Sequence, residues 1–391
     1  MDIFILDSLY RRSQVVDRFQ SLIWTERFSS AGDIELQLSS TFDNRSKFVE
    51  GTKLAINESR RVMQVETVQD GIDDEGRQIL KITGPSIEDV MSNRLALAAV
   101  GDTTTYPKWT LTGTPKVIAT KMFHDICVAG ILDSADIIPL INEGNVLFPA
   151  DTIAPPSDSI TYEVDPKTLY DAEKDICDLY LMGFRLVRNY DLGQLWFDVY
   201  TGSDRTSHQT TYPAVIFSPE MDNLKNPTEL RSIAAYKNVA YVISPVGSEV
   251  VYAQGVDPTV TGFERRVLLV NASDITDTDP VVASAAMIRR GYEELAKNRQ
   301  LSAFDGEISQ TSKYIYGTDY NLGDLVEMRN SDGFSASMQV TEQIIVSDEN
   351  GDRSYPTLSL NQFVTPGSWA SMPAGKQWSD FTTEQWSDMP G

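Results

Sequence analysis

The sequence predicts an α+β fold that is mainly antiparallel β-sheet with a few packed helices. Ile34, Leu36 and Leu38 alternate with polar residues, which is the period-two pattern of a strand with one buried face. Other strand patterns are joined by short turns such as Asn350-Gly351, a typical hairpin turn. Helical patterns follow blocks of strands and do not alternate with single strands. This order favours antiparallel sheet over a parallel α/β fold.

Residues 1–95 predict an N-terminal β-domain closed by one short helix. Pro85 marks the start of this helix, because proline fits the first helical turn. Glu88 and Asp89 follow, where a negative charge interacts favourably with the positive end of the helix dipole. We expect the helix to end near Arg94.

Residues 96–165 differ in composition and predict a loop-rich insertion with one helix. Gly101–Pro107 is rich in threonine and Pro149–Pro156 is rich in proline, and both compositions are typical of loops. Between these loops, apolar residues recur at helical spacing from about Pro115 to Ala129.

Residues 166–258 predict an α+β hairpin domain, and residues 259–360 predict a second β-domain with a preceding helix. In the first, we expect a helix from Asp165-Pro166 to Gly183, then a hairpin that ends at Tyr200. In the second, we expect a helix from about Pro280 to Arg299, followed by the last three strands.

Residues 361–391 form a C-terminal tail with a degenerate tryptophan repeat. Trp369, Trp378 and Trp386 recur at steps of nine and eight residues and make up half of the six tryptophans of the chain. So short a segment with proline and glycine cannot bury three indoles in a core of its own. We expect these tryptophans to dock on a neighbouring subunit or domain, with disorder and carbohydrate stacking as the alternatives.

The charge of the chain limits its partners. There are 56 acidic and 33 basic residues, a formal net charge of −23, and the excess is spread along the chain. Such a surface repels phosphate, so we expect no specific nucleic-acid binding. No apolar run is long enough for a membrane span. The N-terminus lacks a basic signal-peptide region, so we expect folding in a cytoplasm.

The sequence offers little for catalysis or metal binding. His124 is expected on a solvated helix face and His208 in a polar loop. Cys127 and Cys177 are expected to be buried free thiols, since they lie within apolar helical patterns. The acidic loops 70–75 and 274–279 do not have the turn glycine and distal glutamate of a calcium loop at the right offsets. We therefore predict no enzyme activity, no catalytic residue, no cofactor and no metal.

Short segments in a fixed order carry a resemblance to a known family. The segments are Trp24–Phe28, Gly32–Leu38, Gly51–Ile56, Ile82–Ser86, Asn93-Arg94, Gly183–Val187, Gly202–Thr206, Val215–Ser218, Asp222–Leu224, Tyr236–Ala240, Tyr320–Asp324 and Gln339–Glu342. In this order they resemble the minor tail proteins, or tail-hub (baseplate hub) proteins, of siphophages that infect Gram-positive bacteria. The resemblance covers residues 1–95 and 166–360, and Asp204, Arg205 and Thr206 belong to a family-like structural motif within it.

The resemblance implies a non-enzymatic virion protein with two tube-like β-barrel or sandwich domains in each protomer. It implies a homotrimeric hub at the tail tip around the channel through which DNA passes, assembled in the host cytoplasm. The implied partners are the tail tube or distal tail protein, the tape-measure protein and downstream tip or fibre proteins. The alternative is a tail-associated cell-wall lysin or glycan-binding tip protein. From the residues themselves, we interpret Asp204 and Arg205 as a structural pair at the exit of the hairpin.

Overall fold

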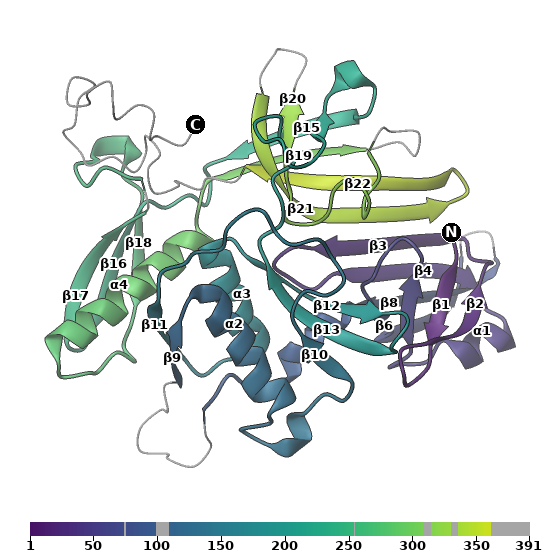
Figure 1. Cartoon of the computed structure of the whole chain (residues 1–391), viewed down its shortest axis with the longest axis horizontal. Coiled ribbons are helices and arrows are strands. Elements are labelled where there is room, and N and C mark those ends of the chain that lie inside the picture. The colour runs from purple at the N-terminus through teal and green to yellow at the C-terminus, as the bar shows by residue number, and fades with distance from the viewer. Residues whose placement is uncertain (74–75, 99–108, 254, 308–313, 330–334, 361–391) are drawn as a thin grey trace. The chain divides into compact units, whose positions relative to one another are not determined.

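The computed structural model describes residues 1–73, 76–98, 109–253, 255–307, 314–329 and 335–360. It confirms an α+β fold with mainly antiparallel sheets and few helices (Figure 1). Among the described strands, no sheet closes into a barrel, so the β-domains are built from open sheets. The tryptophans Trp369, Trp378 and Trp386 lie outside the described residues.

The largest sheet joins the beginning of the chain to its end. Its order is β15-β19-β22-β21-β3-β4-β8-β7, with β20 paired to β21 and β14 paired to β20. Trp24 of β3 lies opposite Ile345 of β21. Strands β3 and β21 are neighbours in Figure 1 although they are far apart in sequence. The strands are β3 (Ser21–Arg27), β4 (Asp33–Ser39), β7 (Thr67–Ile72), β8 (Gln78–Pro85), β14 (Ile216–Phe217), β15 (Lys225–Ser232), β19 (Leu301–Glu307), β20 (Leu325–Arg329), β21 (Ser335–Asp348) and β22 (Gly351–Leu360).

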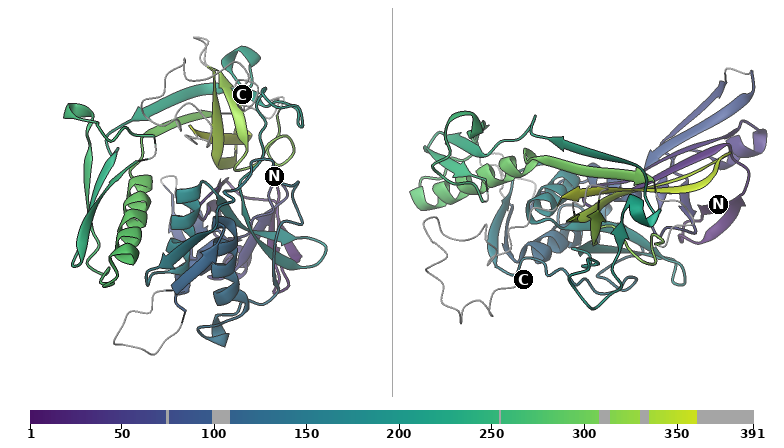
Figure 2. Two further views of the ribbon diagram at one scale, coloured as in Figure 1. Left: turned by 60° about the vertical axis from the view of Figure 1, so that its left-hand side comes forward. Right: turned by 90° about the horizontal axis from the view of Figure 1, so that it is seen from above.

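One end of this sheet is an exposed hairpin. Strands β7 and β8 project beyond their neighbours, as the right-hand view of Figure 2 shows. Strand β7 is the last strand in the order, and all its side chains are at least partly exposed. Its outer edge therefore presents backbone groups that another strand could pair with.

A smaller sheet covers one face of the first. The strands β2 (Arg12–Val16), β1 (Ile3–Leu6), β5 (Lys53–Ile56) and β6 (Met63–Gln64) pair in this order, all antiparallel. Their apolar side chains share a core with Trp24, Leu36 and Ile82 of the large sheet. The alternation predicted for residues 34–38 is confirmed, since Ile34, Leu36 and Leu38 are buried. Helix α1 (Phe42–Lys47) is capped by Thr41.

A second core lies between helices and a three-stranded sheet. Phe123 stacks on Phe197 with ring centroids 3.7 Å apart, so residues 109–164 share this core with residues 169–199. Its elements are β9 (Trp109–Gly113), α2 (Pro115–Phe123), a π-helix (His124–Val128), β10 (Ile141–Glu143), β11 (Ile160–Val164), α3 (Leu169–Tyr180), β12 (Gly183–Asn189) and β13 (Gln194–Tyr200).

The helices begin and end near the predicted positions, with two corrections. The helix expected at Pro85 is a 3-10 helix, Ile87–Asn93, and Pro85 is the last residue of β8. The helix expected at Asp165-Pro166 begins at Leu169, because the Thr168 side chain accepts from Asp171 N and caps it there. Three further 3-10 turns are Ser134–Asp136, Pro219–Met221 and Gly262–Glu264.

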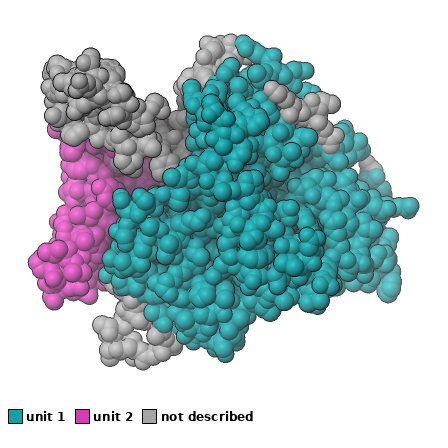
Figure 3. Space-filling view, viewed as in Figure 1, with its two compact units in different colours: residues 1–229, 303–359 teal, residues 230–302, 360–391 magenta. Residues whose placement is uncertain are grey.

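The chain forms two compact units, coloured in Figure 3. One comprises residues 1–229 and 303–359, and the other residues 230–302 and 360–391. The division of the sequence into five segments, from 1–95 to 361–391, stays a prediction.

In the second unit, one helix covers one face of a three-stranded sheet. Helix α4 (Pro280–Lys297) packs on β16 (Val239–Ser244), β17 (Gly247–Tyr252) and β18 (Val267–Asn271). Gly291 permits the close approach, since a Cβ there would lie 2.6 Å from Val251 Cγ2. Apolar side chains also lie on the other face, where Tyr241, Ile243 and Leu269 are exposed.

Candidate functional site

The segment after β13, Thr201–Thr206, forms the centre of a buried polar junction. Residue 204 forms a parallel bridge with Leu325, and Arg205 N donates to the carbonyl oxygen of Leu325 at 2.8 Å. Gly202 has a φ of +85°, and a Cβ there would lie 2.3 Å from the carbonyl carbon of Gly323. Glycine is required at this position because of both the backbone angle and the close approach. The segment thereby joins the hairpin to the start of β20.

Asp324 binds this segment from the opposite side. Its carboxylate accepts from Ser203 N at 2.7 Å and Asn321 N at 3.0 Å, and it lies 3.5 Å from Arg205 Nε. Burial raises the pKa of Asp324 to about 6, although these amides and the Arg205 guanidinium act in the opposite direction. The Arg205 guanidinium also lies 4.0 Å from the centre of the Tyr212 ring.

The interpretation of Asp204 and Arg205 as a pair is wrong, because Arg205 pairs with Asp324. Successive side chains of an extended segment point in opposite directions, so neighbours in sequence cannot readily form an ion pair. Asp204 Oδ1 instead accepts from Thr206 N at 2.8 Å and stabilises the turn that follows. The Thr206 hydroxyl accepts from His208 N at 3.3 Å, and His208 itself is exposed, as expected of a polar loop residue.

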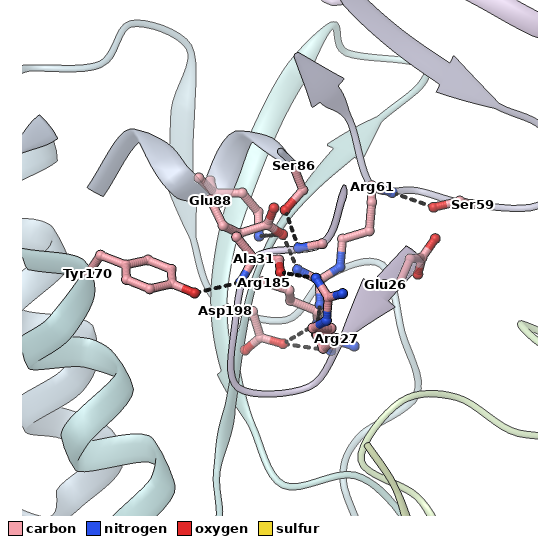
Figure 4. A network of polar contacts seen from close by, with 12 residues as sticks. Glu26, Arg27, Ala31, Ser59, Arg61, Ser86, Glu88, Tyr170, Arg185 and Asp198 are labelled. Carbon is pink, nitrogen blue, oxygen red and sulfur yellow. Dashed lines mark hydrogen bonds and ion pairs between the residues drawn. The ribbon is translucent and has the colours of Figure 1, made fainter. Parts of the chain in front are cut away.

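A second buried ion pair, Arg61 with Glu88, lies nearby in the same unit (Figure 4). Both side chains are almost inaccessible, and Glu88 Oε1 also accepts from Leu186 N at 2.9 Å. Arg61 Nη2 donates to the carbonyl oxygen of Arg27 at 3.1 Å. Burial acts to lower the pKa of Arg61, but Glu88 and its neighbours raise it more, so the guanidinium stays charged.

A third pair crosses the β12–β13 hairpin. Arg185 Nη2 donates to Asp198 Oδ2 at 2.6 Å. Figure 4 shows these two residues in contact. The guanidinium lies between the rings of Phe148 and Tyr200, 3.7 and 3.9 Å from their centroids. Tyr200 in turn packs edge-on against Phe28, and burial raises the pKa of Tyr200 to about 12. Arg185 and Arg205 therefore combine charge pairing with aromatic packing.

Sequence reasoning identified Asp204, Arg205 and Thr206 but missed Arg61, Glu88 and Asp324. One signal was available for Arg185 and Asp198. Each is flanked on both sides by apolar or aromatic residues of its strand, and a charge at such a position requires a partner. Which charged residue becomes the partner depends on strand register and tertiary packing.

The three buried ion pairs are suited to holding segments together and poorly suited to catalysis. Cys127 and Cys177 are buried free thiols, as predicted. Burial raises both thiol pKa values, that of Cys127 to about 12, which disfavours the reactive thiolate. His124 Nδ1 lies 2.9 Å from Glu143 Oε2 on a partly exposed surface. Among the described residues, no cluster of three or more metal-binding side chains occurs.

Comparison with known proteins shows which protein family the chain belongs to. The model of the Siphovirus ReqiPepy6 Gp37-like protein family matches residues 2–358. The chain belongs to this family. The match includes residues 96–165, which lie outside the segments that resemble tail-hub proteins in sequence. A comparison with curated protein sequences gave no significant match.

Two solved structures share the fold of this family member. The tail protein from Neisseria meningitidis MC58 has a TM-score of 0.56 at 11% identity, over 95% of this chain and 98% of that chain. The prophage MuSo2 43 kDa tail protein from Shewanella oneidensis has a TM-score of 0.55 at 12% identity, over 92% and 98%.

In the part of the chain that the structure describes, no helix is long and apolar enough to cross a membrane.

Proposed function

We propose that the protein forms a homotrimeric hub at the tip of a siphophage tail. The hub joins the tail tube, or a distal tail protein, to the host-recognition apparatus and encloses the channel for DNA. The observation that carries this proposal is the family match over residues 2–358. The fold that the chain shares with two tail proteins supports the proposal, because the similarity covers almost the whole length of both proteins.

The charge of the chain supports the channel part of the proposal. With a net charge of −23, a lumen wall built from this protein would repel phosphate, so DNA would pass without binding specifically. The tape-measure protein would occupy the same channel before ejection, and assembly would take place in the host cytoplasm.

Assembly requires surfaces that pair with other subunits. The exposed edge of β7 supports strand pairing between protomers, and the apolar outer face of β16 and β18 supports packing against a neighbour. Trp369, Trp378 and Trp386 would dock on an adjacent subunit or on a tip or fibre protein. Asp204, Arg205 and Thr206 would keep the hairpin attached to β20 in each protomer.

The protein acts in this proposal without enzyme activity, cofactor or metal. The alternative is a cell-wall lysin or glycan-binding tip protein, and incubation of the purified protein with Gram-positive cell walls separates the two. We expect no release of soluble fragments, whereas clear digestion would contradict the proposal.

The position in the virion can be tested directly. An antibody against this chain, labelled with gold and mixed with purified particles, should bind at the end of the tail that is distant from the head. Labelling of the head, or along the whole tail, would overturn the proposal.

A further inference from the structure

Three arginines converge on one tyrosine at the surface of the first unit. The guanidinium carbons of Arg12, Arg60 and Arg188 lie 5.3, 5.1 and 4.3 Å from the centre of the Tyr190 ring. The Tyr190 hydroxyl donates to the carbonyl oxygen of Ser59 at 2.7 Å, which fixes the ring. We refer to these four residues as the Tyr190 cluster.

The Tyr190 cluster has no counter-ion among the residues that the structure describes. Arg12 Nη2 donates to the amide oxygen of Asn57 at 2.7 Å, and Arg188 Nη1 donates to the carbonyl oxygen of Tyr10 at 3.1 Å. Both acceptors are neutral, and no carboxylate forms an ion pair with any of the three arginines. This is unusual in a chain with 56 acidic residues.

Arg188 provides a second observation that points to a missing partner. Its side chain is only 1% exposed, and its Nε and Nη2 atoms have no hydrogen-bond acceptor in the structure. Burial lowers the pKa of Arg188, Tyr190 opposes this effect, and Arg12 and Arg60 lower the pKa further. A buried guanidinium with free donors and two cationic neighbours is costly unless an anion binds.

The cluster is accessible to such an anion, because Arg12 is exposed and Arg60 is half-buried. The group that fits is a carboxylate, whose two oxygens match the paired donors of guanidinium groups. A second copy of this chain carries an excess of carboxylates spread over its sequence. A basic patch on one chain can bind an acidic patch on the next in a head-to-tail contact, which closes into a ring when the rotation between copies closes.

We propose that the Tyr190 cluster binds a carboxylate side chain of a second copy of this chain. This inference rests on the proposed homotrimeric hub and assigns one contact between its protomers. In the isolated chain the three arginines repel one another, and in the ring a carboxylate offsets part of this repulsion.

The first test compares self-association of the full chain in the analytical ultracentrifuge at low and high salt. The change Arg12→Gln with Arg60→Gln should weaken association about tenfold or more, since a lost interfacial charge pair is costly. The matched control is Lys121→Gln with Lys174→Gln, which also removes two positive charges from this unit. Lys121 and Lys174 already pair with Asp125 and Asp178, so association should be unchanged.

The outcomes separate this inference from the proposed function. If the wild-type chain forms trimers and the cluster variant associates equally well, the inference fails and the hub stands. If the wild-type chain is monomeric both in solution and in purified tails, the inference and the proposed hub both fail.

Inorganic phosphate is the probe for a free anion. Stabilisation of the wild type by phosphate, with normal association of the cluster variant, would assign the cluster to a small oxyanion and overturn the inference.

A cross-linking experiment identifies the carboxylate. The Arg60→Lys variant is mixed with isotope-labelled wild-type chain and treated with a carbodiimide, which joins amines to carboxylates in direct contact. We expect a cross-link from position 60 to an aspartate or glutamate of the labelled chain. Cross-links from position 60 only within one chain would contradict the proposal.

Discussion

The first unit contains two groups of arginines with opposite surroundings. Arg61, Arg185 and Arg205 are buried, and each has a carboxylate partner within the chain. The three arginines of the Tyr190 cluster have none. The comparison shows that carboxylates of this acidic chain neutralise the arginines that hold its segments together, whereas the Tyr190 cluster has no such partner among the described residues. This difference is the reason for proposing that the cluster binds another molecule.

The largest expected effect comes from breaking a buried pair. The change Glu88→Gln keeps the size of the side chain but leaves Arg61 buried without a carboxylate. We expect the free energy of unfolding to fall by about 3–5 kcal/mol in denaturant titrations. The control Glu35→Gln breaks a pair with Lys81 in which both side chains are 40% exposed, and it should cost about 1 kcal/mol or less. Equal effects of the two changes would contradict the account.

The next effect concerns the backbone that holds Arg205 against Asp324. The change Gly202→Ala adds a Cβ 2.3 Å from the carbonyl carbon of Gly323 at a φ of +85°. We expect a loss of about 3 kcal/mol, from backbone strain together with overpacking. Gly351 is the matched control, since it has a φ of +99° but open space around its Cβ position. Gly351→Ala should cost about 1 kcal/mol, and thermal unfolding of both variants measures the difference.

Asp324 should make the free energy of unfolding depend on pH. Its pKa is raised from 3.8 to about 6 in the folded state, so the folded protein holds this proton more tightly than the unfolded chain. The stabilisation from this group is complete below about pH 4 and is lost as the pH rises through 6. The loss amounts to about 3 kcal/mol, and Asp324→Asn should remove it from the profile of stability against pH. Parallel profiles of the two proteins between pH 4 and 7 would contradict this assignment.

The smallest effect is expected in the Tyr190 cluster of the dissociated chain. Arg60→Gln breaks no ion pair and relieves repulsion with Arg188, so the free energy of unfolding should change by less than about 1 kcal/mol. Arg185→Gln is the contrasting variant, because it leaves Asp198 buried without its partner and should cost about 3–5 kcal/mol. A large loss for Arg60→Gln would show that the cluster stabilises the fold of the single chain.

Local features of the fold could be predicted from the sequence. The alternation at Ile34, Leu36 and Leu38 is a property of neighbouring residues, and so is the start of α2 at Pro115. The burial of Cys127 and Cys177 follows from their apolar neighbours in the same way. Such patterns depend on secondary-structure periods that the sequence shows directly.

Long-range pairing could not be predicted. The contacts of Trp24 with Ile345 and of Arg205 with Asp324 depend on which strands become neighbours. Many registers are compatible with the same alternation, and only the complete packing of the core selects one. The prediction that Asp204 pairs with Arg205 was wrong for this reason, because it considered only residues that are adjacent in sequence.

The central claim is that three copies of this protein form a ring at the tail tip. A cryo-electron microscopy reconstruction of intact tails, made without imposed symmetry, tests it most directly. The account predicts three copies around an open channel, with carboxylates on the channel wall and the Tyr190 cluster of each copy against its neighbour. A single copy, a closed centre or a basic channel wall would contradict it.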